Sequence, residues 1–171
     1  LLFDGALRRT EQTVRRLGEV LGASERADGL ARRVRAVLDD AAQLRAAVPP
    51  GERPRVYFAR GAAGLVTAGP GTLSGELLDE VAVANVAVTR APNLAQVSLE
   101  QVIGWAPDWI VATDPSFVAS IDRHPVWSRL PAVRARRVLL APRLPFGWFD
   151  APPALNRLAG LVWLSSVLHP A

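Results

Sequence analysis

Three short apolar runs in the C-terminal two thirds of the chain most constrain its fold. Each has the length and composition of a buried strand: VYFA at 56–59, WIVAT at 109–113 and RVLLA at 137–141. The segments between them carry helix-capping residues or helical spacing. Strands that alternate with helices pair in parallel, with right-handed crossovers. The sequence therefore predicts an α/β fold with a mostly parallel sheet flanked by helices.

Capping residues indicate where several of these helices begin. Thr72 is placed to cap a helix over 73–81, and Ser98 with Gln101 has capping-box spacing. The last helix is predicted over 153–168. It is apolar on nearly all sides, which predicts that it is deeply packed.

A long helix precedes the α/β segment. The spacing of apolar residues predicts two helices before the break at PPGERP (49–54). Gly22 is expected to end the first helix and Ser24 to cap the second, which runs from about Glu25 to Val48. A helix of that length is about 36 Å long. Its apolar stripe must pack on something, and the α/β segment is not expected to cover all of it.

The charge is carried by arginine alone. The chain has 20 basic residues, none of them lysine, and a net charge of +4. Each side of Pro54 carries ten arginines and eight acids, and this even spread does not match the clustered charge of a nucleic-acid-binding surface. Since the chain has no cysteine, disulfides, thiolate metal sites and cysteine nucleophiles are excluded.

Enzyme signatures are missing from the 171 residues. The sequence has no GxSxG, Walker, HExxH or GxGxxG motif. The stretch GPGT (69–72) lacks the lysine of a phosphate-binding loop and is interpreted as a strand-to-helix turn. His124 and His169 lie far apart in sequence, and no third ligand is evident for a metal site. The chain is therefore not expected to be an enzyme or to hold a resident cofactor.

The candidate binding residues lie where three predicted strands end. Ligands of parallel sheets bind beyond the carboxyl ends of the strands, which places the loops starting at Arg60, Asp114 and Arg143 at one edge. An arginine there suits a carboxylate, a phosphate or an oxyanion. The alternative is that the arginines are solvent-facing charges at strand ends and that Asp114 is a turn or capping residue.

The tryptophans divide into two groups. Trp148 lies in the proline-rich loop at the same edge, together with Phe146, and a loop tryptophan of this kind can serve as a recognition platform. The others lie in or beside predicted apolar elements and are expected to pack in the core. They are Trp105, Trp109, Trp127 and Trp163.

Several of these segments resemble one family. QVSLEQVIGWAPDWIVATD (96–114) resembles the pattern v-S-x-E-q-l-x-x-w-x-P-D-x-I-i of substrate-binding proteins for metal-chelate ABC importers. HPVWSRLPAVRARRVLLAP (124–142) resembles that family's p-x-W-x-x-l-x-A-V-k-x-g-r-V-y-x-x-P. WFDAPPALNRLAGLVWLSSVLHP (148–170) resembles a C-terminal segment of one branch, and residues 76–85 stand where the family has e-l-L-e-x-a-G-G-x-N. The match covers about 54–170.

The resemblance implies a class III periplasmic binding protein fold, in which a long rigid helix joins two α/β lobes and the ligand lies between them. Residues 1–22 would be the end of the N-terminal lobe, 23–50 the connector helix and 54–171 the C-terminal lobe. The ligand would be a metal chelate of the iron–siderophore, haem or cobalamin type, or an oxyanion. It would be cargo and not a cofactor.

The resemblance also implies a partner and a location. Family members dock on an ABC permease through an exposed acid on each lobe, and Glu76 or Asp79 holds that position here. The alternative is a solvent-facing acid on a helix. The protein would be periplasmic or extracytoplasmic, associated with the membrane through the permease or an upstream lipid anchor. One departure is Ala82-Val83-Ala84 in place of the double glycine, so the turn before Asn85 is expected to be built differently.

Two rival functions stay open at this point. One is the α/β lobe of a metal-dependent enzyme whose chemistry lies in another part of the protein. The other is a partner-binding module that kept the fold and lost the ligand.

Overall fold

The three predicted strands form and lie with a fourth in one parallel sheet of order β3-β1-β5-β6. The computed structural model describes residues 5–87, 93–149 and 151–170. Its strands are β1 (Arg55–Ala59), β2 (Val66–Ala68), β3 (Ala84–Asn85), β4 (Leu94–Gln96), β5 (Trp109–Ala112) and β6 (Val138–Leu140). Strands β2 and β4, which were not expected from the sequence, pair antiparallel in a second small sheet.

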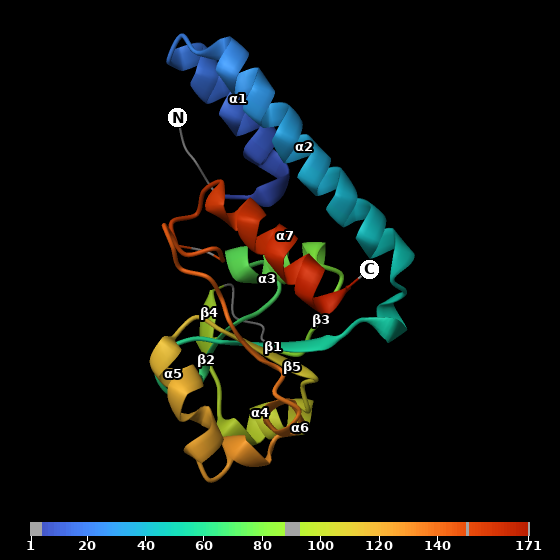
Figure 1. Ribbon diagram of the computed structural model, residues 1–171, viewed down its shortest axis with the longest axis vertical. Coiled ribbons are helices and arrows are strands. Elements are labelled where there is room, and N and C mark those ends of the chain that lie inside the picture. Colours follow the sequence, from blue (N-terminus) through green and yellow to red (C-terminus); the bar gives the residue numbers. More distant parts are fainter. Residues whose placement is uncertain (1–4, 88–92, 150, 171) are drawn as a thin grey trace.

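Helices cover both faces of the parallel sheet (Figure 1). α3 and α7 lie on one face, and α4, α5 and α6 lie on the other. The predicted α/β fold is therefore confirmed. The α-helices are α1 (Thr10–Val20), α2 (Ser24–Ala47), α3 (Leu73–Glu80), α4 (Leu99–Trp105), α5 (Pro115–Ser120), α6 (Pro131–Arg134) and α7 (Asn156–Leu168). Short 3-10 turns are η1 (Leu7–Arg9), η2 (Pro50–Glu52), η3 (Ile121–Arg123) and η4 (Trp127–Arg129).

Successive residues of β1 contribute to opposite cores. Phe58 points into the core beneath α3 and α7, whereas Tyr57 belongs to the core beneath α4 and α6. Strand β5 divides its side chains in the same way, with Val111 on the first face and Ile110 on the second. This alternation follows from the period-two geometry of a strand covered on both sides.

The N-terminal helices α1 and α2 form an antiparallel hairpin that extends beyond the body (Figure 1). Gly18 makes the close packing possible, because a Cβ atom there would lie 2.2 Å from Cβ of Ala27. Gly22 ends α1 with a φ of 65°, as expected. The prediction for Ser24 is wrong, since helix α2 begins at Ser24 and its side chain makes no capping hydrogen bond.

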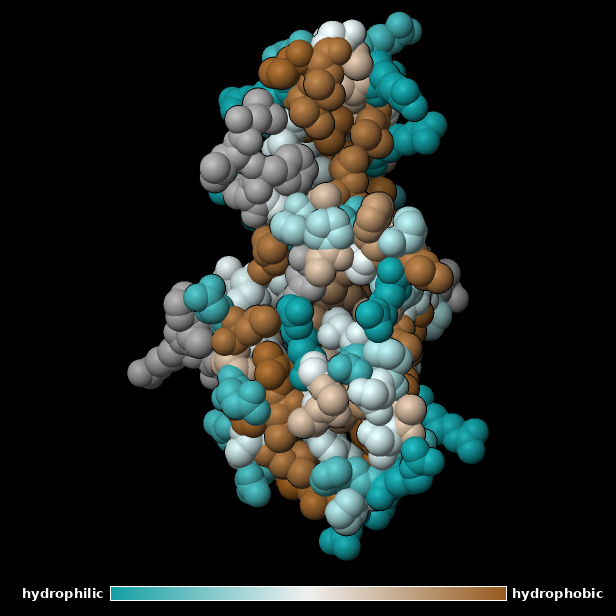
Figure 2. Space-filling view, turned by 90° about the vertical axis from the view of Figure 1, so that its left-hand side faces the viewer, coloured by the Kyte–Doolittle hydropathy of each residue, from teal (hydrophilic) through white to brown (hydrophobic). Residues whose placement is uncertain are grey.

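The hairpin leaves part of its apolar surface uncovered, as the long predicted stripe suggested. Figure 2 shows apolar side chains gathered at the hairpin end of the molecule. The exposed large hydrophobic residues of α1, α2 and the turn between them are Leu17, Val20, Leu21 and Leu30. None of the helices in the described ranges combines the length and the apolar character that crossing a membrane requires.

Helix α7 is less deeply packed than its sequence suggested. Leu161 and Leu164 are buried, but Val162 is 52% exposed, so the helix has an outer face and that prediction is wrong in part. The four tryptophans that were expected in the core are also not all buried. Trp127 is buried, whereas the others pack on the two cores while staying half-buried. Those half-buried residues are Trp105, Trp109 and Trp163.

Candidate ligand-binding site

The carboxyl ends of three strands meet at a cavity of about 180 Å³. Arg60 follows β1, Thr113 follows β5, and Arg143 follows β6, and all three line it. Trp148 closes another side. The predicted loops therefore do come together, because parallel strands all end at one edge of the sheet.

A second cavity of about 520 Å³ lies next to the first, and Arg60 and Ala151 line both. Its other walls come from the turn that starts α3, residues 71–74, and from Asn93 and Leu94. Arg60 is half-buried between the two spaces. One guanidinium is thus placed to serve both cavities.

The start of α3 is fixed by contacts between neighbouring residues of the turn and the helix. The hydroxyl of Thr72 accepts a hydrogen bond from the Gly75 N–H at 3.0 Å, which confirms the predicted cap. Gly75 has to be a glycine there, since a Cβ atom would lie 2.2 Å from the carbonyl oxygen of Gly69. The turn therefore packs closely against the first residues of its helix.

The loop that presents Trp148 is closed on itself. The Trp148 backbone N–H donates to the Pro142 carbonyl at 3.1 Å, and its indole N–H donates to the Leu144 carbonyl at 3.1 Å. Trp148 is half-buried, and Phe146 at the loop tip is 59% exposed. The Trp148 ring lines the 180 Å³ cavity, whereas Phe146 lines neither cavity, and the role of both rings in binding stays a prediction.

Helix α7 packs against three consecutive carbonyl groups of this loop and hydrogen-bonds two of them. The Asn156 side chain donates to the Gly147 carbonyl, and Arg157 Nε donates to the Phe149 carbonyl at 2.9 Å. The carbonyl oxygen of Trp148, between them, would lie 2.1 Å from a Cβ atom on Gly160. Only a glycine therefore lets the loop approach the helix this closely.

Asp114 lies beside the cavity and caps helix α5. Its carboxylate accepts hydrogen bonds from the Ser116 hydroxyl at 2.6 Å and from the Ser116 N–H at 2.9 Å. These bonds, with a smaller contribution from the charge of Arg143, hold the pKa of Asp114 below its usual range. The carboxylate is therefore occupied by local contacts, as the capping interpretation suggested, and a ligand-binding role stays a prediction.

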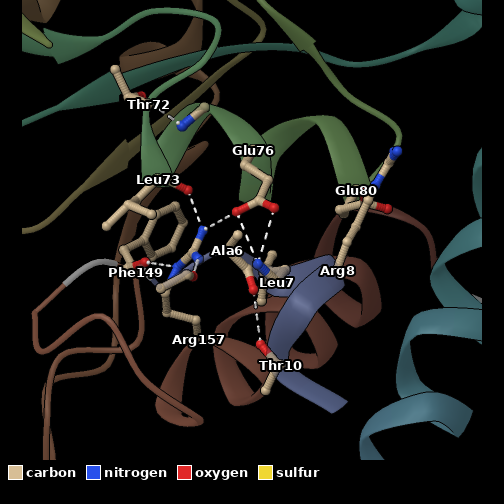
Figure 3. A network of polar contacts seen from close by, with 12 residues as sticks. Ala6, Leu7, Arg8, Thr10, Thr72, Leu73, Glu76, Glu80, Phe149 and Arg157 are labelled. Atoms are coloured by element: carbon tan, nitrogen blue, oxygen red, sulfur yellow. Dashed lines mark hydrogen bonds and ion pairs between the residues drawn. The ribbon is translucent and has the colours of Figure 1, made fainter. Parts of the chain in front are cut away.

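The two candidate docking acids have different surroundings on α3. Glu76 accepts the Leu7 N–H with both oxygens, at 3.0 and 3.1 Å, and pairs with Arg157 at 3.1 Å (Figure 3). Asp79 is exposed. Its pKa is raised, first because neighbouring groups displace part of the water around the carboxylate and then by the charge of Glu80. Of the two acids, Asp79 is the one that presents its carboxylate to solvent.

In the described part of the chain, no three His, Cys, Asp or Glu side chains gather in a group that could hold a metal ion. What the edge offers instead is the guanidinium groups of Arg60 and Arg143 and the aromatic ring of Trp148.

The sequence profile of the family described as periplasmic binding protein matches residues 3–143. The chain belongs to the periplasmic binding protein family. This confirms the resemblance drawn from the sequence motifs.

Three relatives illustrate the likeness. An ABC transporter solute-binding protein from Sulfurospirillum deleyianum is 32% identical with a TM-score of 0.91, over 99% of this chain and 54% of that chain. The molybdate-binding protein MolA from Haemophilus influenzae is 33% identical over 122 residues, 70% of this chain and 34% of MolA. The structure of MolA bound to molybdate gives 28% identity and a TM-score of 0.78, over 99% of this chain and 53% of that chain.

A periplasmic haem-binding protein from Pseudomonas aeruginosa shares the fold, with a TM-score of 0.77 at 23% identity over 96% of this chain and 61% of that chain. The chain spans about half the length of the solved structures of MolA and the Sulfurospirillum protein. The shorter sequence alignment with MolA covers about a third of that protein.

Of the three positions where the family pattern has glycine and this chain has another residue (82, 83 and 136), two lie in the left-handed region. They are Ala82, in the turn before Asn85, and Arg136, in the turn before β6. Both adopt the left-handed conformation, with φ of 58° and 57°. The backbone at each turn thus keeps a conformation that glycine adopts most readily, at some cost to the alanine and the arginine.

Several residues of the edge were not expected from the sequence. Thr113 directly follows β5 at the end of an ordinary apolar run, and Asn156 and Arg157 lie in a helix that was interpreted as apolar on nearly all sides. A usable signal existed, because Arg157 is the only charged residue in the sequence of α7. A single charge in an otherwise apolar helix indicates a buried and paired group.

Proposed function

We propose that the chain is the C-terminal lobe and connector helix of a solute-binding protein that captures a metal oxyanion and delivers it to an ABC permease. In this proposal 1–22 end the first lobe, 23–50 form the connector and 54–171 form the second lobe. Family membership supports a binding role and not an enzymatic one. The coverage of about half of the solved relatives supports a second lobe in the whole protein.

The observation that carries the ligand class is the position of Arg60. It lines both cavities at the carboxyl edge of the sheet, with Arg143 at the rim of one of them. A guanidinium stays charged at any physiological pH and offers several N–H donors in one plane, which suits the oxygens of a tetrahedral anion. A relative named for molybdate binding supports the same class.

A second candidate ligand is an anionic metal chelate of the siderophore, haem or cobalamin type. The observation that favours it is the Trp148 ring, which lines the same cavity as both arginines, with the exposed Phe146 on the same loop. Such rings suit the organic part of a chelate. In either case the metal species is cargo.

Delivery requires a docking surface and a location outside the cytoplasm. For the docking acid of this lobe we favour Asp79, because Glu76 is engaged with Leu7 and Arg157. The membrane association would come from the permease or from a lipid anchor upstream of this chain. Exchange of Asp79 for asparagine in the full-length protein should then lower transport while leaving ligand affinity unchanged.

Binding is tested by titrating the full-length protein with molybdate, tungstate, ferric siderophore, haem and cobalamin, followed by calorimetry and tryptophan fluorescence. Saturable binding of molybdate and tungstate is expected. Arg60→Gln should weaken it by at least about tenfold, the effect of losing one charge-assisted hydrogen bond. Arg129→Gln, an exposed arginine on η4, is the matched control and should bind as the unmodified protein does.

Other results would favour the rivals. Saturable binding of a chelate without molybdate would select the second candidate. Metal-dependent turnover would favour an enzyme, and the absence of binding to any of the five probes would favour a partner-binding module.

A further inference from the structure

A fully buried arginine lies directly behind the candidate site. Arg157 is in the first turn of α7 and has no exposed surface. A buried charge is costly unless it is paired and hydrogen-bonded. Its contacts therefore deserve an explanation beyond the packing of an apolar helix.

The guanidinium joins three segments that are distant in sequence (Figure 3). Nε donates to the Phe149 carbonyl at 2.9 Å, and the two terminal nitrogens donate to the carbonyls of Gly5 and Leu73. Nη2 also pairs with Glu76 at 3.1 Å. One planar group with five donors thus neutralises its charge on one carboxylate and holds three peptide carbonyls.

Two of these carbonyls belong to residues that line the candidate site. Leu73 begins α3 and lines the 520 Å³ cavity, whereas Phe149 ends the Trp148 loop and lines the 180 Å³ cavity. Arg60 lies in both cavities. One rigid guanidinium therefore bridges the start of α3 and the Trp148 loop from behind.

The third carbonyl extends this connection to the N-terminal segment. Gly5 precedes Leu7, whose N–H is held by both oxygens of Glu76. Arg157 and Glu76 therefore hold the segment that leads into η1, and Arg157 also holds the two segments that line the candidate site. A lysine could not reproduce this arrangement, because its ammonium is a point charge without the planar fork.

We propose that Arg157 is a positioning residue for ligand binding: it holds the start of α3 and the Trp148 loop at the spacing that the ligand requires. The assignment rests on the proposed function for its effect on affinity. Its geometric part, the joint order of the two segments, does not depend on any ligand.

The test uses the full-length protein and the variants Arg157→Lys and Arg157→Met, with molybdate as the probe. Both variants should bind at least about tenfold more weakly at a temperature where circular dichroism shows them folded. Val102→Ala, in the core on the opposite face of the sheet, is the control for lost stability and should bind normally. Arg157→Lys binding with unchanged affinity would overturn the proposal.

Hydrogen–deuterium exchange of the ligand-free protein separates this proposal from the function. Arg157→Lys should accelerate exchange in both 69–74 and 143–149, and leave α4 unchanged. Unchanged exchange in those two segments overturns the geometric part whatever the ligand is. If the unmodified protein binds no anion while these segments do loosen, the ligand assignment has failed and the geometric part of the Arg157 proposal has held.

Asn156→Ala decides the question if neither Arg157 variant folds. It releases only the contact to Gly147 on the same loop. Weaker molybdate binding and faster exchange confined to 143–149 would support anchoring of the loop by α7. Normal binding and normal exchange would overturn the proposal.

Discussion

The two faces of the parallel sheet are held together by different forces. On the α4, α5 and α6 face, Tyr57, Phe117 and Trp127 form an aromatic cluster, with ring centroids 5.0 Å apart for Phe117 and Trp127 and 6.1 Å for Tyr57 and Trp127. On the α3 and α7 face, buried charges accompany the apolar core. Glu80 there is almost fully buried and pairs with Arg8 and Arg45.

The difference follows from which parts of the chain each face joins. Apart from β1 itself, the aromatic face is built mostly from one stretch, residues 97–133, whose elements follow one another closely. The other face receives η1, the end of α2 and α7, which are far apart in sequence. Directional, charge-assisted contacts specify a geometry there that non-directional apolar packing would leave less defined.

The largest loss of stability is expected from a substitution in the aromatic face. Trp127→Ala should lower the free energy of unfolding by about 3–5 kcal/mol, because it removes a large buried ring and leaves a cavity. Urea denaturation followed by circular dichroism measures it. Trp127→Phe is the matched variant and should lose clearly less. Equal losses for both would mean that the site collapses around either side chain.

A smaller loss is expected from the charged face. Glu80→Gln should lower the free energy of unfolding by about 1–3 kcal/mol, because Arg45 and Arg8 lose their shared carboxylate while much of the packing remains. The same denaturation experiment applies, with the exposed Glu52→Gln as control and an expected change within about 0.5 kcal/mol. A Glu80 variant as stable as the control would show that the ion pairs of Glu80 only offset the free-energy cost of burying its charge.

A stabilising change is expected in the turn before β6, on the aromatic side. Arg136→Gly should raise the free energy of unfolding by about 0.5–1 kcal/mol, because relief of the left-handed strain exceeds the extra freedom of glycine in the unfolded chain. Arg134→Gly, in helix α6 two residues earlier, should instead cost about 1 kcal/mol. Losses at both positions would contradict the strain argument.

The smallest effect concerns the pH response of α3. The raised pKa of Asp79 means that its folded form takes up a proton more readily than the unfolded chain. Its charge therefore opposes folding at neutral pH, and this penalty disappears as the pH falls through the raised pKa. Asp79→Asn should be slightly more stable at pH 7, by no more than about 0.5 kcal/mol. The advantage should shrink toward acid pH in parallel melts, and a constant advantage would exclude titration as its cause.

Local signals predicted the elements that depend on neighbouring residues. The strands at 56–59 and 109–113, the cap at Thr72 and the box at Ser98 and Gln101 are all confirmed, because each is determined within a few residues. Strands β2 and β4 were missed, since three residues are too few for an alternating pattern. Their pairing brings together segments almost 30 residues apart.

The candidate edge could be located from topology, because the three loops follow directly from the order of parallel strands. The supports behind it could not. Arg157 meets Gly5 and Leu73 from 152 and 84 residues away, and Glu80 meets Arg8 across 72. Apolar periodicity carries no information about such partners, so α7 was interpreted as uniformly packed.

Residue 160 of α7 has to be small, because the atom closest to it is a backbone carbonyl oxygen and no side-chain rotation can relieve the overlap. A Cβ atom there would lie 2.1 Å from the Trp148 carbonyl oxygen, so even a methyl group would force the loop and the helix apart. Alanine, serine and valine at that position would push the Trp148 carbonyl away from the helix by increasing amounts. The distance between the Trp148 loop and α7 is therefore set by the size of one residue that lines neither cavity.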